Sequence, residues 1–336
     1  MPAKTVEAPK YKKKDFVSDQ EVRWCPGCGD YAILSAVQQV FAGLGVPREN
    51  LVCVSGIGCS SRFPYYLETF GFHTIHGRAP AVATGIKVAR PDLDVWIVTG
   101  DGDALSIGGN HVIHAMRRNV NLKMLLFNNR IYGLTKGQYS PTSERHKRTP
   151  SSPFGSVDLP FNPIALALGA GATFVARAVD TQIKHLKEVL QAAHAHQGFA
   201  FVEILQNCVI FNDGAFDAYT ERAIRDDRQV ELRPGKPLIY GKELDKGLRM
   251  TSTGIEICSP DEATVWNEKG PTGANAFRIC QTDEGGGLPV PVGIFRAVER
   301  PVYDRDVHDQ LAETRQKLGD GSLEDLLLAG ETWQVS

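Results

Sequence analysis

Four cysteines stand where they could hold a metal centre. Cys25 and Cys28 lie three residues apart in the run Trp24-Cys-Pro-Gly-Cys28, a spacing that can clasp one metal ion or one edge of a cluster. Cys59 and Cys208 each come just after an apolar run of strand length. The chain has seven cysteines in all, and this odd number argues against a disulfide framework and favours reduced thiols or a metal site.

Three interpretations of the Cys25 and Cys28 pair compete. A thioredoxin-like motif should follow an apolar strand, whereas residues 12–23 are polar. A zinc ribbon would need a second such pair close by, and there is none, although zinc held with two distant cysteines stays open. An iron–sulfur cluster would combine the pair with Cys59 and Cys208. The chain lacks the CxxCxxC run of ferredoxin domains, so it would hold one cluster at most, and we expect Cys53, Cys258 and Cys280 to be passive.

A second set of polar residues indicates a site for a divalent cation and a diphosphate. Gly100-Asp101-Gly102 ends one apolar run, and Asn128-Asn129 ends the next. Two neighbouring strand ends can offer a carboxylate and an amide oxygen to one hard cation. The glycines let the backbone approach a diphosphate, and the helix that follows Asp103 adds amide donors. Together these residues predict a magnesium–diphosphate site.

Alternating helices and apolar strands must position these residues. Apolar residues at helical spacing over 33–44 come before an apolar run at 51–55. Further apolar runs lie at 95–98, 122–127 and 199–205. Stretches with helical spacing alternate with them near 80–90, 105–118, 162–169 and 181–196. This pattern predicts an α/β fold with a doubly wound, mainly parallel sheet. Ligands bind outside the carboxyl ends of such strands, so the segments that follow them should converge on one site.

Composition and patterning indicate the domain organisation and exclude some classes of partner. We expect an arm at 1–20, a core domain at 21–210 and an irregular C-terminal extension at 211–336 that makes subunit contacts. The 336 residues carry 37 basic and 39 acidic side chains, a formal charge of -2 that implies neither a nucleic-acid partner nor an anionic membrane. No apolar run approaches the length of a bilayer span, and the lysines near the N-terminus lead into no signal-like stretch, so the cytoplasm is the expected location.

The motifs, in their order, resemble one enzyme family. The spacing from Gly-Asp-Gly to Asn-Asn is similar to the thiamine diphosphate signature. Together with Trp24-Cys-Pro-Gly-Cys-Gly-Asp30, Gly56-Ile-Gly-Cys-Ser60, His76-Gly-Arg78 and the run 129–138, it resembles the β subunits of 2-oxoacid:ferredoxin oxidoreductases over about residues 20–250. The stretch 56–138 most resembles the 2-oxoglutarate-specific branch.

The resemblance implies a set of site residues. It makes Cys25, Cys28, Cys59 and Cys208 the ligands of one 4Fe-4S cluster, and Asp101, Asn129 and the carbonyl of Ile131 the ligands of Mg. The residues implied around thiamine diphosphate are Gly58, Ser60, His76, Gly100, Gly102, Asp103, Tyr132, Gly133, Leu134 and Thr135, with His76 near the thiazolium ring. Arg130 stands where many relatives carry an acid, but its side chain should not reach the metal.

The resemblance also implies a reaction and its partners. Thiamine diphosphate would decarboxylate a 2-oxoacid, with electrons passing through the cluster to ferredoxin, coenzyme A taking the acyl group, and the reverse reaction fixing CO2. Too little chain follows the diphosphate domain for a second domain of this kind. A separate α subunit should therefore complete the site and supply most of the coenzyme A contacts in an obligate heterodimer, as αβ or α2β2.

Two other functions are alternatives. A cluster-free thiamine diphosphate decarboxylase would leave the four cysteines without a role, and a structural zinc module would leave the cation site without one.

Arg62 is the candidate for substrate selection. It lies three residues after Cys59, so it leaves the loop that brings the cluster to the cofactor. An unpaired cation there is unfavourable, and the distal carboxylate of 2-oxoglutarate would compensate it where pyruvate offers only a methyl group. An ion pair with an acid of this chain or of the α subunit is the alternative. We therefore expect 2-oxoglutarate as the substrate, with pyruvate or a branched-chain 2-oxoacid as the alternative.

Overall fold

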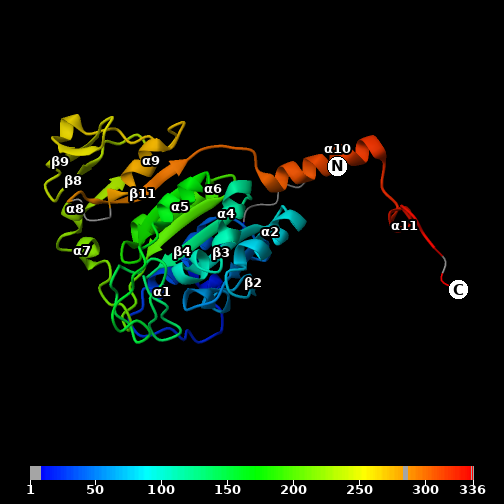
Figure 1. Cartoon of the computed structure of the whole chain (residues 1–336), viewed down its shortest axis with the longest axis horizontal. Helices are drawn as coiled ribbons and strands as arrows, with labels where there is room; N and C mark the ends of the chain where they lie inside the picture. The colour runs from blue at the N-terminus through cyan, green and yellow to red at the C-terminus, as the bar shows by residue number, and fades with distance from the viewer. Residues whose placement is uncertain (1–8, 283–286, 334, 336) are drawn as a thin grey trace.

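An eight-stranded sheet forms the centre of the protein in the computed structural model, which describes residues 9–282, 287–333 and 335 (Figure 1). Its strand order is β2-β1-β3-β4-β6-β5-β11-β7. The strands are β1 (Leu51–Ser55), β2 (Phe70–His73), β3 (Asp94–Gly100), β4 (Lys123–Asn128), β5 (Phe174–Val179), β6 (Ala200–Leu205), β7 (Gln229–Leu232) and β11 (Val290–Ala297). All pairings from β2 to β5 are parallel, β11 pairs antiparallel with β5, and β7 pairs parallel with β11.

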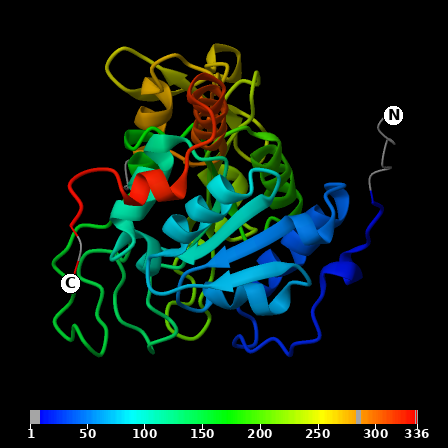
Figure 2. The same ribbon diagram turned by 90° about the vertical axis from the view of Figure 1, so that its right-hand side faces the viewer.

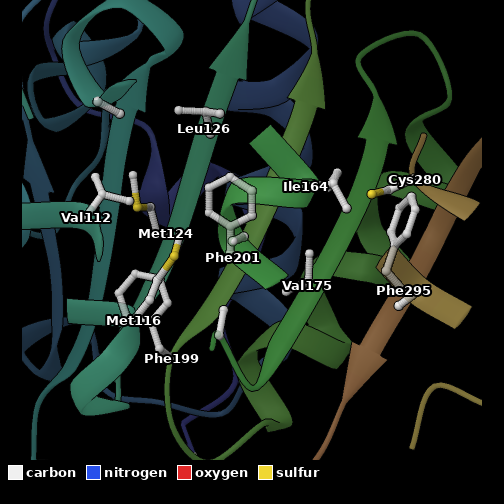
Figure 3. Packing of buried hydrophobic residues seen from close by; sticks show 14 of the residues in the cluster. Val112, Met116, Met124, Leu126, Ile164, Val175, Phe199, Phe201, Cys280 and Phe295 are labelled. Atoms are coloured by element: carbon white, nitrogen blue, oxygen red, sulfur yellow. The ribbon is translucent and has the colours of Figure 1, made fainter. Parts of the chain in front are cut away.

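Helices cover both faces of this sheet, which confirms the doubly wound α/β fold. Helix α1 (Asp30–Gly43) precedes the first strand. The helices that follow between the parallel strands are α2 (Ala79–Ala89), α3 (Asp101–Leu105), α4 (Gly109–Arg118), α5 (Pro163–Gly169) and α6 (Ile183–Ala195). Alternate strand residues point to opposite faces. Val52 and Val54 therefore join the core that includes α2, α4 and α5, whereas Leu51 and Cys53 join the core under α1 and α6. Figure 3 shows the first core, with Met116 and Phe201 among its buried side chains.

The sequence pattern does not reveal two of the parallel strands or the division of one expected helix into two. All four residues of β2 are exposed because it is an edge strand, so it has no apolar run. Strand β5 contains Arg177, which interrupts its apolar side chains. The helix expected near 105–118 is two helices, since α3 ends at Leu105 and α4 begins at Gly109.

The segment 211–336 contains regular elements that its sequence does not reveal. Besides β7 and β11, it holds a small antiparallel sheet of β8 (Ile239–Tyr240), β9 (Lys246–Met250) and β10 (Ile255–Cys258). Its helices are α7 (Asp217–Thr220), α8 (Arg225–Arg228), α9 (Ala274–Ile279), α10 (Tyr303–Leu318) and α11 (Leu323–Leu327). Most of these elements are short and polar, which hides their periodicity. Because β7 and β11 extend the central sheet, the expected boundary near 210 does not separate two sheets.

The first and last elements that the structure describes lie at the outside of this body. In the N-terminal arm, the 3-10 helix Lys13–Phe16 buries Phe16 against Phe41 of α1, with ring centroids 5.9 Å apart. Short 3-10 helices also span Arg48–Asn50, Ser60–Tyr66 and Pro260–Glu262. Helix α10 leaves the body and leads into α11 at the far end of the molecule, as Figures 1 and 2 show. Within the described ranges, no helix is long and apolar enough to cross a bilayer.

Candidate functional site

One cavity of about 480 Å³ lies at the carboxyl ends of β1, β3 and β4. Its volume is in the range of small-molecule and cofactor sites. The predicted residues that line it are Gly58, Cys59, Ser60, His76, Gly100, Asp101, Gly102, Asp103, Asn129, Ile131, Tyr132, Gly133, Leu134 and Thr135. The structure therefore brings together the whole predicted set of diphosphate and magnesium residues. Five further lining residues were not among the predicted site residues: Ile57, Ser106, Ile107, Phe127 and Gln138.

Asp101 is a buried carboxylate at the first residue of α3. Its Oδ2 accepts hydrogen bonds from the hydroxyls of Ser140, at 2.5 Å, and Thr142, at 2.6 Å. Burial raises the pKa of the Asp101 carboxyl, and these two hydroxyls oppose that shift. A buried anion of this kind would be stabilised by a bound cation. Ser140 and Thr142 were missed from the sequence because they reach the site through a long loop without helices or strands.

Asn129 lines the cavity, whereas Asn128 stabilises the loop behind it. The side-chain amide of Asn129 donates to Gln206 Oε1 at 2.8 Å, and its Oδ1 accepts from the backbone N–H of Ile131 at 3.1 Å. Asn128 donates instead to the buried Glu203 at 2.7 Å. Of the two adjacent asparagines, only Asn129 can therefore offer an oxygen to a ligand in the cavity.

Arg130 points away from the cavity. Its backbone has a φ of 57°, and its guanidinium pairs with Glu144 at 2.9 Å and lies 4.7 Å from the centroid of the Phe216 ring. Arg130 is absent from the residues that line the cavity. The structure thus agrees with the expectation that this side chain does not reach a metal held by Asp101.

The Asp103 carboxylate joins two loops of the site to strand β3. Its Oδ1 accepts from the backbone N–H of Gly77 at 2.7 Å and from that of Ile57 at 3.2 Å, and its Oδ2 accepts from the Thr99 hydroxyl at 2.8 Å. The Gly77 bond fixes the loop that carries the exposed His76. Although Asp103 lines the cavity, its carboxylate is thus already occupied by this chain's own donors.

Gly102 and Tyr132 lie in close contact on the cavity wall. The Tyr132 hydroxyl donates to the carbonyl oxygen of Gly102 at 3.0 Å. A Cβ added to Gly102 would lie 2.1 Å from Cε1 of that ring. No side chain fits between the ring and the backbone, so this position requires glycine.

A second cavity, of about 190 Å³, is lined by all four predicted cluster ligands, Cys25, Cys28, Cys59 and Cys208. It shares Cys59, Asn129, Gly133 and Leu134 with the first cavity, so a single layer of residues separates the two. A Cβ on Gly133 would lie 3.4 Å from Sγ of Cys208 and 3.8 Å from Sγ of Cys59. Burial raises the pKa of Cys59 to about 12, and burial together with Asp30 raises that of Cys28.

The thiols around this cavity form no disulfide. Each of the seven cysteines is unbridged. Among the described residues, no group of three or more His, Cys, Asp or Glu side chains is arranged to hold a metal ion. Cys53 and Cys280 are buried in the cores, and Cys258 lies on the small sheet, away from both cavities.

Arg62 lies beside the first cavity rather than in its wall. It is half-buried, and it lines both the cysteine cavity and a third cavity of about 420 Å³. This third cavity shares Ile57, Gly58 and Leu134 with the first. The Arg62 guanidinium donates to the carbonyl oxygen of Arg23 at 3.3 Å, and within the described part of the chain it forms no ion pair.

Comparisons with known proteins agree with this geometry. The family model described as "Thiamine pyrophosphate enzyme, C-terminal TPP binding domain" matches residues 56–204, which contain both strand-end motifs. The chain is 53% identical over 338 residues to the 2-oxoglutarate oxidoreductase subunit KorB of Mycobacterium tuberculosis, covering 98% of this chain and 90% of that protein. It is 50% identical over 255 residues to the 2-oxoacid:ferredoxin oxidoreductase subunit beta of a Sulfolobus species, covering 74% and 80%.

A solved structure has the same fold over nearly its whole length. It is the 2-oxoglutarate:ferredoxin oxidoreductase from Magnetococcus marinus with 2-oxoglutarate, coenzyme A and succinyl-CoA bound. The TM-score is 0.75 at 36% sequence identity, over 95% of this chain and 96% of that chain. With its thiamine diphosphate domain and relatives of this identity and coverage, the chain belongs to the β subunits of the 2-oxoacid:ferredoxin oxidoreductases.

Proposed function

We propose that this chain is the β subunit of a 2-oxoglutarate:ferredoxin oxidoreductase, which converts 2-oxoglutarate and coenzyme A to succinyl-CoA and CO2. The observation that carries the proposal is the pair of adjoining cavities: strand-end residues that suit a magnesium diphosphate surround one, and four thiols line the other. The 2-oxoglutarate named for the Mycobacterium tuberculosis and Magnetococcus marinus proteins supports the choice of substrate.

Asp101, Asn129 and the carbonyl of Ile131 would hold Mg on the diphosphate. The donor set fits a hard cation, because it combines one buried carboxylate with neutral oxygens. Bound there, thiamine diphosphate would supply the carbanion chemistry that a 2-oxoacid needs to lose CO2. The chain's own contribution is to orient: Ser140 and Thr142 hold Asp101, and Asp103 holds the loop of His76.

Cys25, Cys28, Cys59 and Cys208 would hold one 4Fe-4S cluster. Four thiols around one small cavity match the ligand set of such a cluster, and the shared wall at Gly133 would keep it close to the cofactor. Ferredoxin would accept the electrons. Replacement of Cys208 by alanine should lower the iron content and abolish dye reduction, whereas Cys258→Ala should change neither. Full iron content and activity in Cys208→Ala would overturn the ligand assignment.

Arg62 would select 2-oxoglutarate by binding its distal carboxylate. Its guanidinium has no acid partner in the described residues, and the third cavity places it next to the cofactor cavity. A charge-assisted pair contributes roughly 1.5–3 kcal/mol, so Arg62→Ala should reduce kcat/KM for 2-oxoglutarate by about 10- to 150-fold. Arg62→Lys should recover only part of this loss, because lysine cannot form the two parallel bonds.

The loss on pyruvate should be far smaller, and Arg117→Ala, at an exposed arginine of α4, serves as the matched control. Equal losses on both substrates would assign Arg62 a structural role. A wild-type enzyme that is faster on pyruvate would refute the substrate itself.

The complete enzyme would include an α subunit, as αβ or α2β2, that binds most of coenzyme A. The proposed diphosphate site lies at the edge of one sheet, and the relatives from Mycobacterium tuberculosis and Sulfolobus are each named as a subunit of an oxidoreductase. A preparation rigorously free of the α subunit should therefore show no turnover, and measurable turnover would contradict this assignment.

A further inference from the structure

A third region of the molecule, far from both cavities of the proposed active site, carries concentrated positive charge. A cleft of about 650 Å³ lies between the end of α5, helix α9 and the end of β11. Three arginines line it: Arg278 on α9, Arg296 on β11 and Arg300 just after it. The residues that line this cleft include no aspartate or glutamate from the described part of the chain.

The hydrogen bonds of the three guanidiniums that the described residues show all go to backbone carbonyl oxygens. Arg278 donates to the carbonyl oxygen of Thr251, Arg296 to that of Gly270 at 2.9 Å, and Arg300 to that of Gly171 at 3.0 Å. None of them forms an ion pair within the described ranges, whereas Arg225, Arg233 and Arg249 each pair with an acid. Burial and the neighbouring Arg300 both hold the pKa of Arg296 below its usual range. Among the residues that the structure describes, positive charge is thus gathered in this cleft without an acidic side chain in its lining.

The wall of the cleft is built around these side chains. Gly273 has a φ of 69°, and a Cβ there would lie 2.6 Å from Nη1 of Arg296, so glycine makes room for the guanidinium. Phe277 lies in the same wall with 47% of its surface exposed. The residues beneath are fixed, since Cys280 and Phe295 pack in the core with Ile164 (Figure 3). The cleft therefore offers several donors and one exposed aromatic face on a rigid base.

We propose that this cleft binds the phosphate groups of a nucleotide-sized ligand, with its base against Phe277. Arginine forks match phosphate oxygens in pairs, and an aromatic ring offers a stacking surface to a purine. The volume suits one such ligand and is small for a folded protein partner.

The ligand of this cleft is distinct from the reacting molecules. The cleft opens at Gly171 and Val298, beside the amino end of β5, whereas the cofactor cavity lies at the carboxyl ends of the parallel strands. The six residues of β5 alone separate these edges by about 20 Å. Because the cleft and the cofactor cavity lie at opposite ends of the strands, the proposed site is separate from the catalytic one.

Calorimetric titration of the αβ holoenzyme, saturated with Mg and thiamine diphosphate, tests the proposal with ADP and with inorganic pyrophosphate. Saturation keeps both probes out of the cofactor cavity. Wild type should bind both, and Arg296→Gln with Arg300→Gln should weaken both by at least about 10-fold. Phe277→Ala should weaken ADP and leave pyrophosphate unchanged. Arg315→Gln on the exposed face of α10 is the matched control and should bind as wild type does.

Turnover and thermal unfolding of each variant show that it is folded. The absence of saturable ADP binding to the wild-type holoenzyme would overturn the proposal, as would equal binding by wild type and the double variant. Protection of the three arginines from phenylglyoxal in the αβ complex, without any ADP binding, would assign the cleft to the subunit interface instead. None of these results depends on which 2-oxoacid the enzyme uses.

Discussion

Replacement of Asp103 by alanine tests whether this carboxylate fastens the loops of the cofactor site. The substitution removes the acceptor of three hydrogen bonds and leaves the backbone N–H groups of Gly77 and Ile57 without their partner. An unsatisfied buried donor costs about 1–3 kcal/mol, so we expect a loss of about 3–5 kcal/mol in the free energy of unfolding. Against a typical total of about 5–15 kcal/mol, this loss is large.

Asparagine at the same position should behave differently. Its Oδ1 can still accept from both backbone N–H groups, and its Nδ2 can donate to the Thr99 hydroxyl, which can turn to accept. Asp103→Asn should therefore lose only the charge assistance, about 1 kcal/mol. Asparagine has the size of aspartate, whereas alanine lacks the carboxylate group. The difference in stability between the two variants therefore reports the hydrogen bonds together with the atoms that make them.

The assay is denaturant unfolding of the chain purified with its α subunit, combined with the thiamine diphosphate concentration that gives half-maximal activity. Asp103→Ala should raise that concentration, because the loop of His76 loses its tether. Asp309→Ala on the exposed face of α10 is the control and should match wild type. Equal behaviour of Asp103→Ala and Asp103→Asn would refute the reasoning.

Three further substitutions test the site, the core and the pH dependence. Gly102→Ala should weaken thiamine diphosphate binding by about 10-fold, because the added methyl group overlaps a tyrosine ring. At Gly109 an added methyl group meets no atom, so Gly109→Ala should leave the binding unchanged. The dependence of activity on cofactor concentration measures both. Glu203→Ala removes the carboxylate that pairs with the buried Arg177 at 2.7 Å and accepts from Asn128, and it should cost about 3–5 kcal/mol in denaturant unfolding, most of it recovered by Glu203→Leu with Arg177→Met. Burial lowers the pKa of Lys123 from 10.5 to about 8, and the unfolded chain keeps this proton to higher pH, so wild type should gain stability relative to Lys123→Met between pH 8 and 10.5. A constant difference across that window would contradict this last expectation.

The sequence predicts the centre of the fold well because its buried parallel strands are nearly continuous apolar runs. The strand ends at Gly100 and Asn128 could be located from the same runs, which is why Asp101 and Asn129 meet as expected at one cavity. The edge strand β2 could not be predicted, since an exposed strand has no such run.

Long-range contacts account for what the sequence does not reveal at the site. Ser140 and Thr142 reach Asp101 through about 40 residues of chain, and nothing in their local pattern marks them. Asp103 was expected beside the diphosphate, but only the folded arrangement shows that backbone donors from two other loops occupy its carboxylate. The arginine cleft likewise joins α9 to the end of β11, segments whose sequence shows no common motif.

The position of β11 between β5 and β7 has a consequence for how the protein is made. On a ribosome, β5 is complete at Val179, but the strand that covers its free edge begins only at Val290. At ordinary rates of synthesis, that edge stays open for roughly 5 to 20 s, and an open edge can pair with another nascent chain. A gene fragment that ends near residue 210 would leave the edge uncovered permanently. We therefore expect such a fragment to aggregate, although it contains every proposed ligand of the cofactor and the cluster.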